Sequence, residues 1–140
     1  MTLEIAETRD IALCRQLRRV VFIEEQGVSE ADELDDLDEV AVHLLAVLDG
    51  APVGAARLLT DGDTGKIGRV CVLQAARGAG IGAAVIRAAV ARFRGMPGIA
   101  KVKLGAQVHA LGFYAGLGFA PVGEDYLDAG IVHRDMVLRF

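Results

Sequence analysis

Seven short, mainly apolar runs of the chain are typical of β-strands, and in two of them, 2–7 and 99–107, apolar and polar positions alternate as in strands with one buried face. The runs are "TLEIAE" at 2–7, "VHLLAVL" at 42–48, "VGAARLL" at 53–59, "KIGRVCVL" at 66–73, "IAKVKLGAQ" at 99–107, "FAPVGEDYL" at 119–127 and "IVHRDMVLRF" at 131–140. Turn residues in "DGAP", "TDGDTG" and "DAG" separate neighbouring runs, and we expect 42–48 and 53–59 to form an antiparallel hairpin.

Three other stretches have helical spacing. Residues 10–23 place apolar side chains about one turn apart after Asp10, a suitable N-cap. Residues 80–94 carry an apolar stripe that includes Val85, Ile86 and Phe93. In the short helix 110–117 we expect Phe113 and Leu117 to face the core and Tyr114 to point towards the rim. The element order predicts a mixed α/β (α+β) protein.

Composition and charge restrict the class of protein. A chain of 140 residues suits a single domain, residues 1–140, with one substantial core. The net charge of −4 argues against a nucleic-acid partner. The most apolar helix, 81–93, contains two arginines and is too short for a membrane span, and the N-terminal residues do not resemble a secretory signal. Cys14 and Cys71 follow no disulfide or metal-ligand spacing, so we expect a cytoplasmic protein with no metal.

The charges are unevenly distributed. Residues 24–39, "EEQGVSEADELDDLDE", hold nine of the nineteen acidic side chains and no basic one. This acidic segment could steer a cationic substrate towards a site, or it could be a solvated loop.

The run "RVCVLQAARGAGIGA" at 69–83 places Gly78, Gly80 and Gly82 where a strand hands over to a helix. Unpaired backbone N–H groups at a helix N-terminus bind anions, and glycines let a phosphate approach them closely. A tight turn that needs glycine only for its geometry is the simpler alternative. A dinucleotide fingerprint is excluded because it should follow the first strand and precede a ribose-binding acid, and the Gly-Lys-Ser/Thr of a Walker loop is absent.

The motif resembles the acetyl-CoA-binding loop of the GNAT N-acetyltransferases, Arg/Gln-x-x-Gly-x-Gly/Ala, through Arg77, Gly80 and Gly82. "FYAGLGF" at 113–119 resembles the family's late Phe-Tyr-x-x-x-Gly-Phe motif, and "VFIEEQGVSE" and "LDAGIVHRDM" resemble small members of the YjcF/ElaA kind. The resemblance implies the GNAT fold: a mixed, mostly antiparallel sheet of six to seven strands with about four helices and splayed central strands.

The resemblance also implies where acetyl-CoA binds. The pyrophosphate should lie on the loop, and the pantetheine arm should pair with the preceding strand, which beside a gap offers ladder hydrogen bonds. The cofactor-binding residues expected on this basis are Val70, Cys71, Val72, Arg77, Gly78, Ala79, Gly80, Ile81, Gly82 and Ala83. The thiol of Cys71 is expected only to pack.

Acetyl transfer to an amine needs a base, an oxyanion site and an acid for the departing thiolate. The resemblance assigns the acid to Tyr114, and the backbone N–H of Val72 suits the oxyanion. Many relatives carry a glutamate on the central strand, but "KIGRVCV" has none. Glu25 and His133 are therefore the candidate bases, with Gln26, His43 or a water chain as further options.

The expected function is transfer of an acetyl group from acetyl-CoA to a primary amine, of a small molecule or peptide, by direct attack through a tetrahedral intermediate. Two alternatives stay open: a non-catalytic acyl-CoA sensor, and an enzyme like the acyl-homoserine-lactone synthases. No nucleic acid or membrane partner is expected, and the last two strands could pair between subunits in a homodimer.

Overall fold

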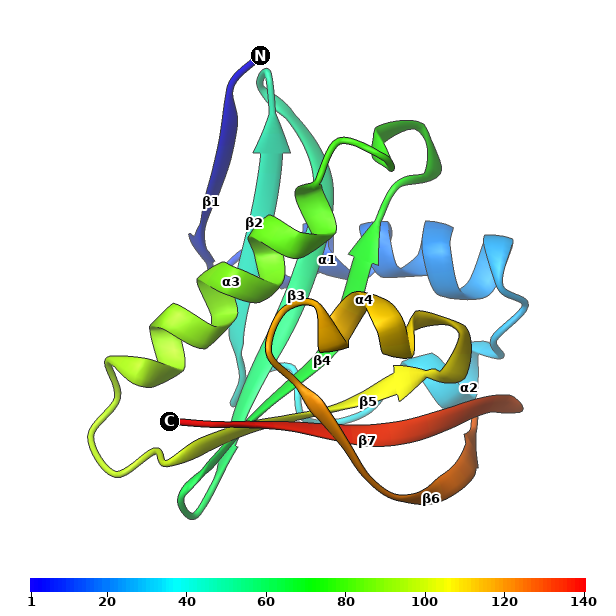
Figure 1. Ribbon diagram of the computed structural model, residues 1–140. Helices are drawn as coiled ribbons and strands as arrows, with labels where there is room; N and C mark the ends of the chain where they lie inside the picture. The colour runs from blue at the N-terminus through cyan, green and yellow to red at the C-terminus, as the bar shows by residue number, and fades with distance from the viewer.

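The computed structural model describes residues 1–140, and its centre is one seven-stranded sheet (Figure 1). The strands are β1 (Leu3–Thr8), β2 (Val42–Leu48), β3 (Ala51–Asp61), β4 (Thr64–Val72), β5 (Lys101–Gln107), β6 (Ala120–Asp128) and β7 (Ile131–Arg139). They lie in the order β1-β2-β3-β4-β5-β7-β6, and every neighbouring pair is antiparallel except β4 and β5. The predicted mixed, mostly antiparallel sheet is therefore confirmed.

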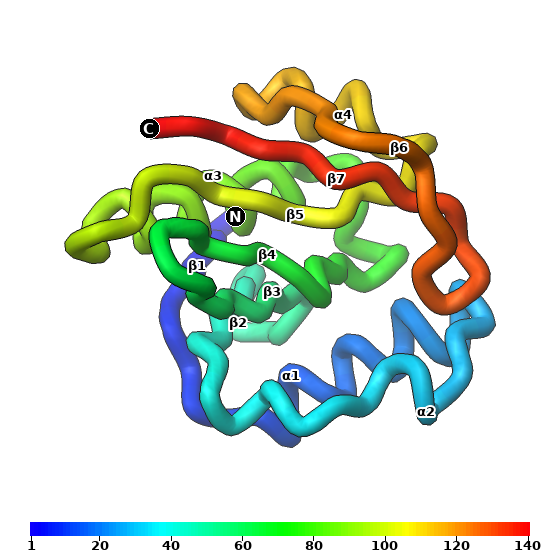
Figure 2. Tube along the Cα trace, turned by 90° about the horizontal axis from the view of Figure 1, so that it is seen from below, coloured from blue at the N-terminus to red at the C-terminus, as the bar shows by residue number.

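Helices cover both faces of this sheet (Figure 2). The α-helices are α1 (Ile11–Arg18), α2 (Glu30–Glu33), α3 (Ile81–Arg94) and α4 (Leu111–Ala115), and the short connecting helices are η1 (Arg19–Glu25), η2 (Gln74–Ala76) and η3 (Val108–Ala110). The helix predicted over 10–23 is present in two parts, because after α1 the chain continues as the π-helix η1. No helix has both the length and the apolar character needed to cross a membrane.

Two apolar clusters form on opposite faces of the sheet because side chains alternate along each strand. On β3, Ala56 and Leu58 join the larger cluster beneath α3, which contains Phe93. The preceding residue, Ala55, points to the other face and joins the smaller cluster beneath α1, which contains Cys14 and Cys71. Both cysteines are free, and both are buried in this smaller cluster.

The parallel pair β4–β5 separates part-way along its length. The two strands pair only from Thr64 opposite Lys101 to Ile67 opposite Leu104, although both continue for several residues (Figure 1). At the same point the β3–β4 register shifts between Ala55 and Arg57, so that β4 carries a bulge. The splayed central strands expected from the resemblance are thus present.

Candidate active site

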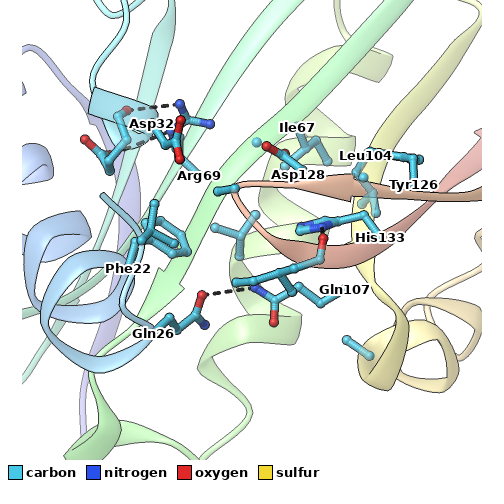
Figure 3. A pocket seen from close by; sticks show the side chains of 18 of the residues that line it. Phe22, Gln26, Asp32, Ile67, Arg69, Leu104, Gln107, Tyr126, Asp128 and His133 are labelled. Atoms are coloured by element: carbon cyan, nitrogen blue, oxygen red, sulfur yellow. Dashed lines mark hydrogen bonds and ion pairs between the residues drawn. The ribbon is translucent and has the colours of Figure 1, made fainter. Parts of the chain in front are cut away.

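The gap between β4 and β5 opens into a cavity of about 340 Å³. Its walls come from η1 and α2 on one side, from β4, β5 and α4 at the back, and from the β6–β7 hairpin on the other side (Figure 3). A hydrogen bond from Gln107 Nε2 to Gln26 Oε1, 3.1 Å long, joins β5 to the segment after η1 across this cavity. Segments distant in sequence therefore meet around one pocket.

The glycine loop lies between the end of β4 and the start of α3. Gly78 and Gly80 have φ angles of +87° and +77°, and Gly80 is the N-cap residue of α3. No side chain caps this helix, and its first turn carries no acid, so its first N–H groups are left for another partner. A Cβ added at Gly78 or Gly80 would meet no atom within 4 Å, which shows open space against the backbone. The loop therefore fits a phosphate group, including the pyrophosphate of coenzyme A.

Arg77, beside these glycines, is already paired within the protein. Its two terminal nitrogens donate to the carboxylate of Glu25, both at 2.6 Å, and its Nε donates to the carbonyl of Val72 at 3.0 Å. The hydrogen bonds from Arg77 lower the pKa of Glu25 and thereby favour its charged form. This arrangement links η1 to the glycine loop and makes Glu25 a weaker candidate base.

The hydrogen bonds between β4 and β3 show which backbone groups of β4 face the gap. The N–H of Leu73 donates to Val53 at 2.8 Å, so the alternation of an antiparallel ladder turns the backbone groups of Val72 away from β3 and towards the gap. By the same alternation, those of Cys71 belong to the β3 ladder opposite Ala55. Cys71 is 3% exposed, and burial raises the pKa of its thiol to about 12, so the side chain packs as expected.

Tyr114 lies against the larger core and lines the pocket. Its ring makes edge contacts with Phe113 and Phe119, at centroid distances of 5.0 and 6.2 Å. Burial raises the pKa of its hydroxyl, which donates to no group of the protein. The prediction that Phe113 faces the core is wrong, since this ring is 45% exposed. The partly buried residues here are Leu111, Tyr114 and Leu117, at a spacing of three, so Tyr114 and not Phe113 shares a face with Leu117.

The histidines lie in different surroundings. His43 is buried, with Nε2 2.7 Å from the carbonyl of Asp38, so it has a structural role. His133 lines the pocket and stacks on Tyr126 at 5.9 Å between ring centroids. Its Nδ1 lies 2.7 Å from the carbonyl of Ile131, and this contact requires a proton on Nδ1 and leaves Nε2 as an acceptor.

In the acidic segment, residues 24–39, some carboxylates are buried and paired with arginines, so the segment is not simply a solvated loop. Asp38 is 1% exposed and accepts hydrogen bonds from Arg15 and Arg18 at 2.8 Å and from Arg57 at 3.1 Å. Glu33 is also buried and pairs with Arg18. The sequence did not indicate these pairs, because each joins residues more than fourteen positions apart on different elements.

Comparison with known proteins identifies the family. Residues 21–140 match the acetyltransferase (GNAT) domain family. The chain belongs to the GNAT acetyltransferases. It is 34% identical over 122 residues to the uncharacterized N-acetyltransferase YjcF of Bacillus subtilis, with 86% of each chain covered. The chain is therefore an acyl-CoA-dependent N-acyltransferase, as the motifs predicted.

Solved structures agree with this assignment. The crystal structure of Escherichia coli ElaA is 29% identical, with a TM-score of 0.87 over 99% of this chain and 100% of that one. A GNAT acetyltransferase from Elizabethkingia anophelis, solved with acetyl-CoA bound, is 16% identical and shares the fold, with a TM-score of 0.74 over 99% of this chain and 98% of the other. The GNAT family uses acetyl-CoA as acyl donor. No group of three or more histidine, cysteine or acidic side chains is placed to hold a metal ion.

Proposed function

We propose that residues 1–140 form one acetyltransferase domain that moves an acetyl group from acetyl-CoA to a primary amine by direct attack. The observation that carries this proposal is the continuity of the site. The open edge of β4 leads from the pocket, at Val70, to the uncapped N-terminus of α3. A long donor that is anionic at one end and reactive at the other fits this path.

The residues that would hold acetyl-CoA form two groups. The N–H groups from Gly78 to Ala83 would bind the pyrophosphate, because they are unpaired and approachable. The backbone groups of Val70 would pair with the amide-bearing arm along the gap, Val72 would meet the thioester end through its N–H, and Cys71 would contribute packing alone. When bound, acetyl-CoA supplies an activated acetyl thioester.

Three groups of the chain would perform the chemistry. His133 Nε2 would accept the proton of the attacking amine, because it lines the pocket, carries no hydrogen bond of its own and belongs to a side chain oriented through Nδ1. The N–H of Val72 would donate to the oxyanion that forms as the N–C bond is made. Tyr114 would give its proton to the sulfur as the C–S bond breaks, because its raised pKa keeps the hydroxyl protonated.

The cysteines and the last strand of the sheet bear on the compartment and the oligomeric state of the protein. Two buried free cysteines are consistent with the reducing cytoplasm. Strand β6 is the last strand of the sheet and is exposed along its whole length, so a second copy of the chain could pair there to form a homodimer.

A release assay tests this function. Purified protein, acetyl-CoA and a panel of primary amines should release free thiol in proportion to acetylated amine. Binding of acetyl-CoA with no release for any amine would instead support the sensor. Release driven by S-adenosylmethionine and an acyl donor would support the lactone-synthase alternative.

A further inference from the structure

We propose that the acceptor is a small amino acid whose carboxylate binds to Arg69, while its amine faces the carboxylates that line the same cavity. This inference names the acceptor class of the proposed acetyltransferase and therefore rests on that function. Three features of the pocket support it: the placement of Arg69, the incomplete pairing of its guanidinium group, and two unpaired carboxylates in the same cavity.

Arg69 occupies an unusual backbone position. It lies in the β4 bulge with a φ of +51°, in the left-handed region that residues other than glycine, asparagine and aspartate seldom adopt. Non-glycine residues persist in this conformation where the surroundings hold them, often at functional sites. The bulge stands where β4 leaves β5, and the side chain of Arg69 lines the cavity, of which it is the sole lining arginine or lysine.

The guanidinium group of Arg69 is only partly satisfied. Its Nη2 donates to the carbonyl of Glu33 at 3.0 Å and to Asp35 Oδ2 at 3.3 Å. Its Nε is buried with no hydrogen bond, since the nearest carboxylate oxygen, Glu33 Oε1, lies 3.7 Å away. Nη1 has no partner in the protein either. Two of three nitrogens therefore lack a hydrogen-bond acceptor: Nε is enclosed beside Glu33, whereas Nη1 is not fully buried and is the donor that a ligand in the pocket can reach.

The group of charged side chains around Arg69 contains one more positive than negative charge, so one further anion would balance it. The cluster to which it belongs joins four arginines to three carboxylates; its members are Arg15, Arg18, Arg57, Arg69, Glu33, Asp35 and Asp38. Burial and the positive charge of Arg57 lower the pKa of Arg69. One carboxylate from the pocket would complete this cluster, because a carboxylate matches the fork of a guanidinium group.

The rest of the pocket suits the cationic end of the acceptor. Asp32 on α2 and Asp128 at the end of β6 line the cavity, and neither forms an ion pair within the protein. Figure 3 shows Asp128 and His133 on the hairpin side and Arg69 on the side of α2. An ammonium group would be attracted to the acids and would lose its proton at His133 before attack. A diamine could pair with the two carboxylates, but it would offer no acceptor to the guanidinium group of Arg69.

A matched pair of acceptors tests this inference. Each amino acid is compared with its own amide, which keeps the amine and side chain but lacks the carboxylate. For the preferred acceptor, kcat/KM should favour the acid by roughly 100-fold, because a site built for a hydrogen-bonded group strongly rejects an analogue that lacks it. In Arg69→Gln this ratio should fall towards one, mainly through KM for the acid, and Arg69→Lys should retain part of it.

Arg134→Gln provides the control, because Arg134 is a β7 arginine that pairs with Asp125 outside the cavity. This variant should keep the wild-type ratio. Thermal melting and acetyl-CoA titration show that each variant is folded.

Amides or diamines acetylated as well as acids would overturn the inference while leaving the proposed acetyltransferase activity intact. A preference for succinyl-CoA over acetyl-CoA that Arg69→Gln abolishes would place the carboxylate on the acyl group and also overturn it. Absence of release with every amine would count against the proposed function itself.

Discussion

Tyr114 and its neighbour Phe113 show what single residues add to the account. The Phe-Tyr pair was recognisable in the sequence, but the direction of each ring was not, because the partly buried positions of this short segment recur every three residues and not at the α-helical spacing of four. The structure places the tyrosine against the core and in the pocket, with its hydroxyl free of protein partners and its pKa raised by burial. A protonated hydroxyl at neutral pH is what a general acid requires.

Replacing Tyr114 by phenylalanine removes this proton and keeps the ring that contacts Phe113 and Phe119. We expect kcat to fall about 100-fold, the usual contribution of a general acid, with little change in acetyl-CoA affinity or melting temperature. Steady-state kinetics and calorimetric titration measure both quantities. Because the pKa of Tyr114 is raised, wild-type kcat should show no basic limb below about pH 10. Unchanged turnover in the variant would move the proton donor elsewhere.

At the scale of elements, the sequence predicted the arrangement well where periodicity and turns determine it. The seven strands, the helix after the glycine loop and the order of the elements all follow from local pattern. The β4 bulge and the pairing of η1 with the loop did not follow, because both depend on contacts between segments distant in sequence. The bond between Glu25 and Arg77, for example, spans 52 positions.

That bond gives a test at the same scale. In Glu25→Gln, Arg77 loses its carboxylate partner and is freed for the phosphates, so acetyl-CoA affinity at low salt should rise about threefold, the worth of an exposed ion pair. Turnover should stay close to wild type, because an ion-paired carboxylate with a lowered pKa is a poor base. Calorimetric titration measures the acetyl-CoA affinity of this variant, and steady-state kinetics measures its kcat. A collapse of kcat with intact binding would make Glu25 the base and displace His133.

At the scale of the whole molecule, the cluster around Asp38 ties α1 and the acidic segment to β3 and β4. Burial alone would raise the pKa of Asp38, but hydrogen bonds from Arg18 and Arg15 outweigh it and hold the pKa far below its usual value. The composition revealed the excess of acids in this segment, yet the arginines that neutralise them are scattered along the sequence. The carboxylates that these arginines neutralise therefore contribute little to the attraction of a cationic acceptor.

Asp38→Asn should lower the free energy of unfolding at neutral pH by about 3 kcal/mol, because it leaves buried arginines without their partner. Asp36→Asn is the matched control: Asp36 is exposed and unpaired, so its change should stay within about 0.5 kcal/mol. Since the pKa of Asp38 is depressed in the folded state, its contribution is complete above about pH 4 and is lost as the pH falls below that value. Urea unfolding of the two variants from pH 7 to pH 2 checks this. Equal effects of both substitutions would contradict the structural role.

The central claim is that the N-terminus of α3 binds coenzyme A, and calorimetric titration of acetyl-CoA into two glycine variants tests it directly. Gly80→Glu places a carboxylate in the cradle. Gly98→Glu adds the same charge after the opposite end of α3, at a glycine with a similar φ of +83° and equally open space. Both variants should fold, Gly98→Glu should bind as the wild type does, and Gly80→Glu should show no measurable binding. Equal binding by the two variants would contradict the account.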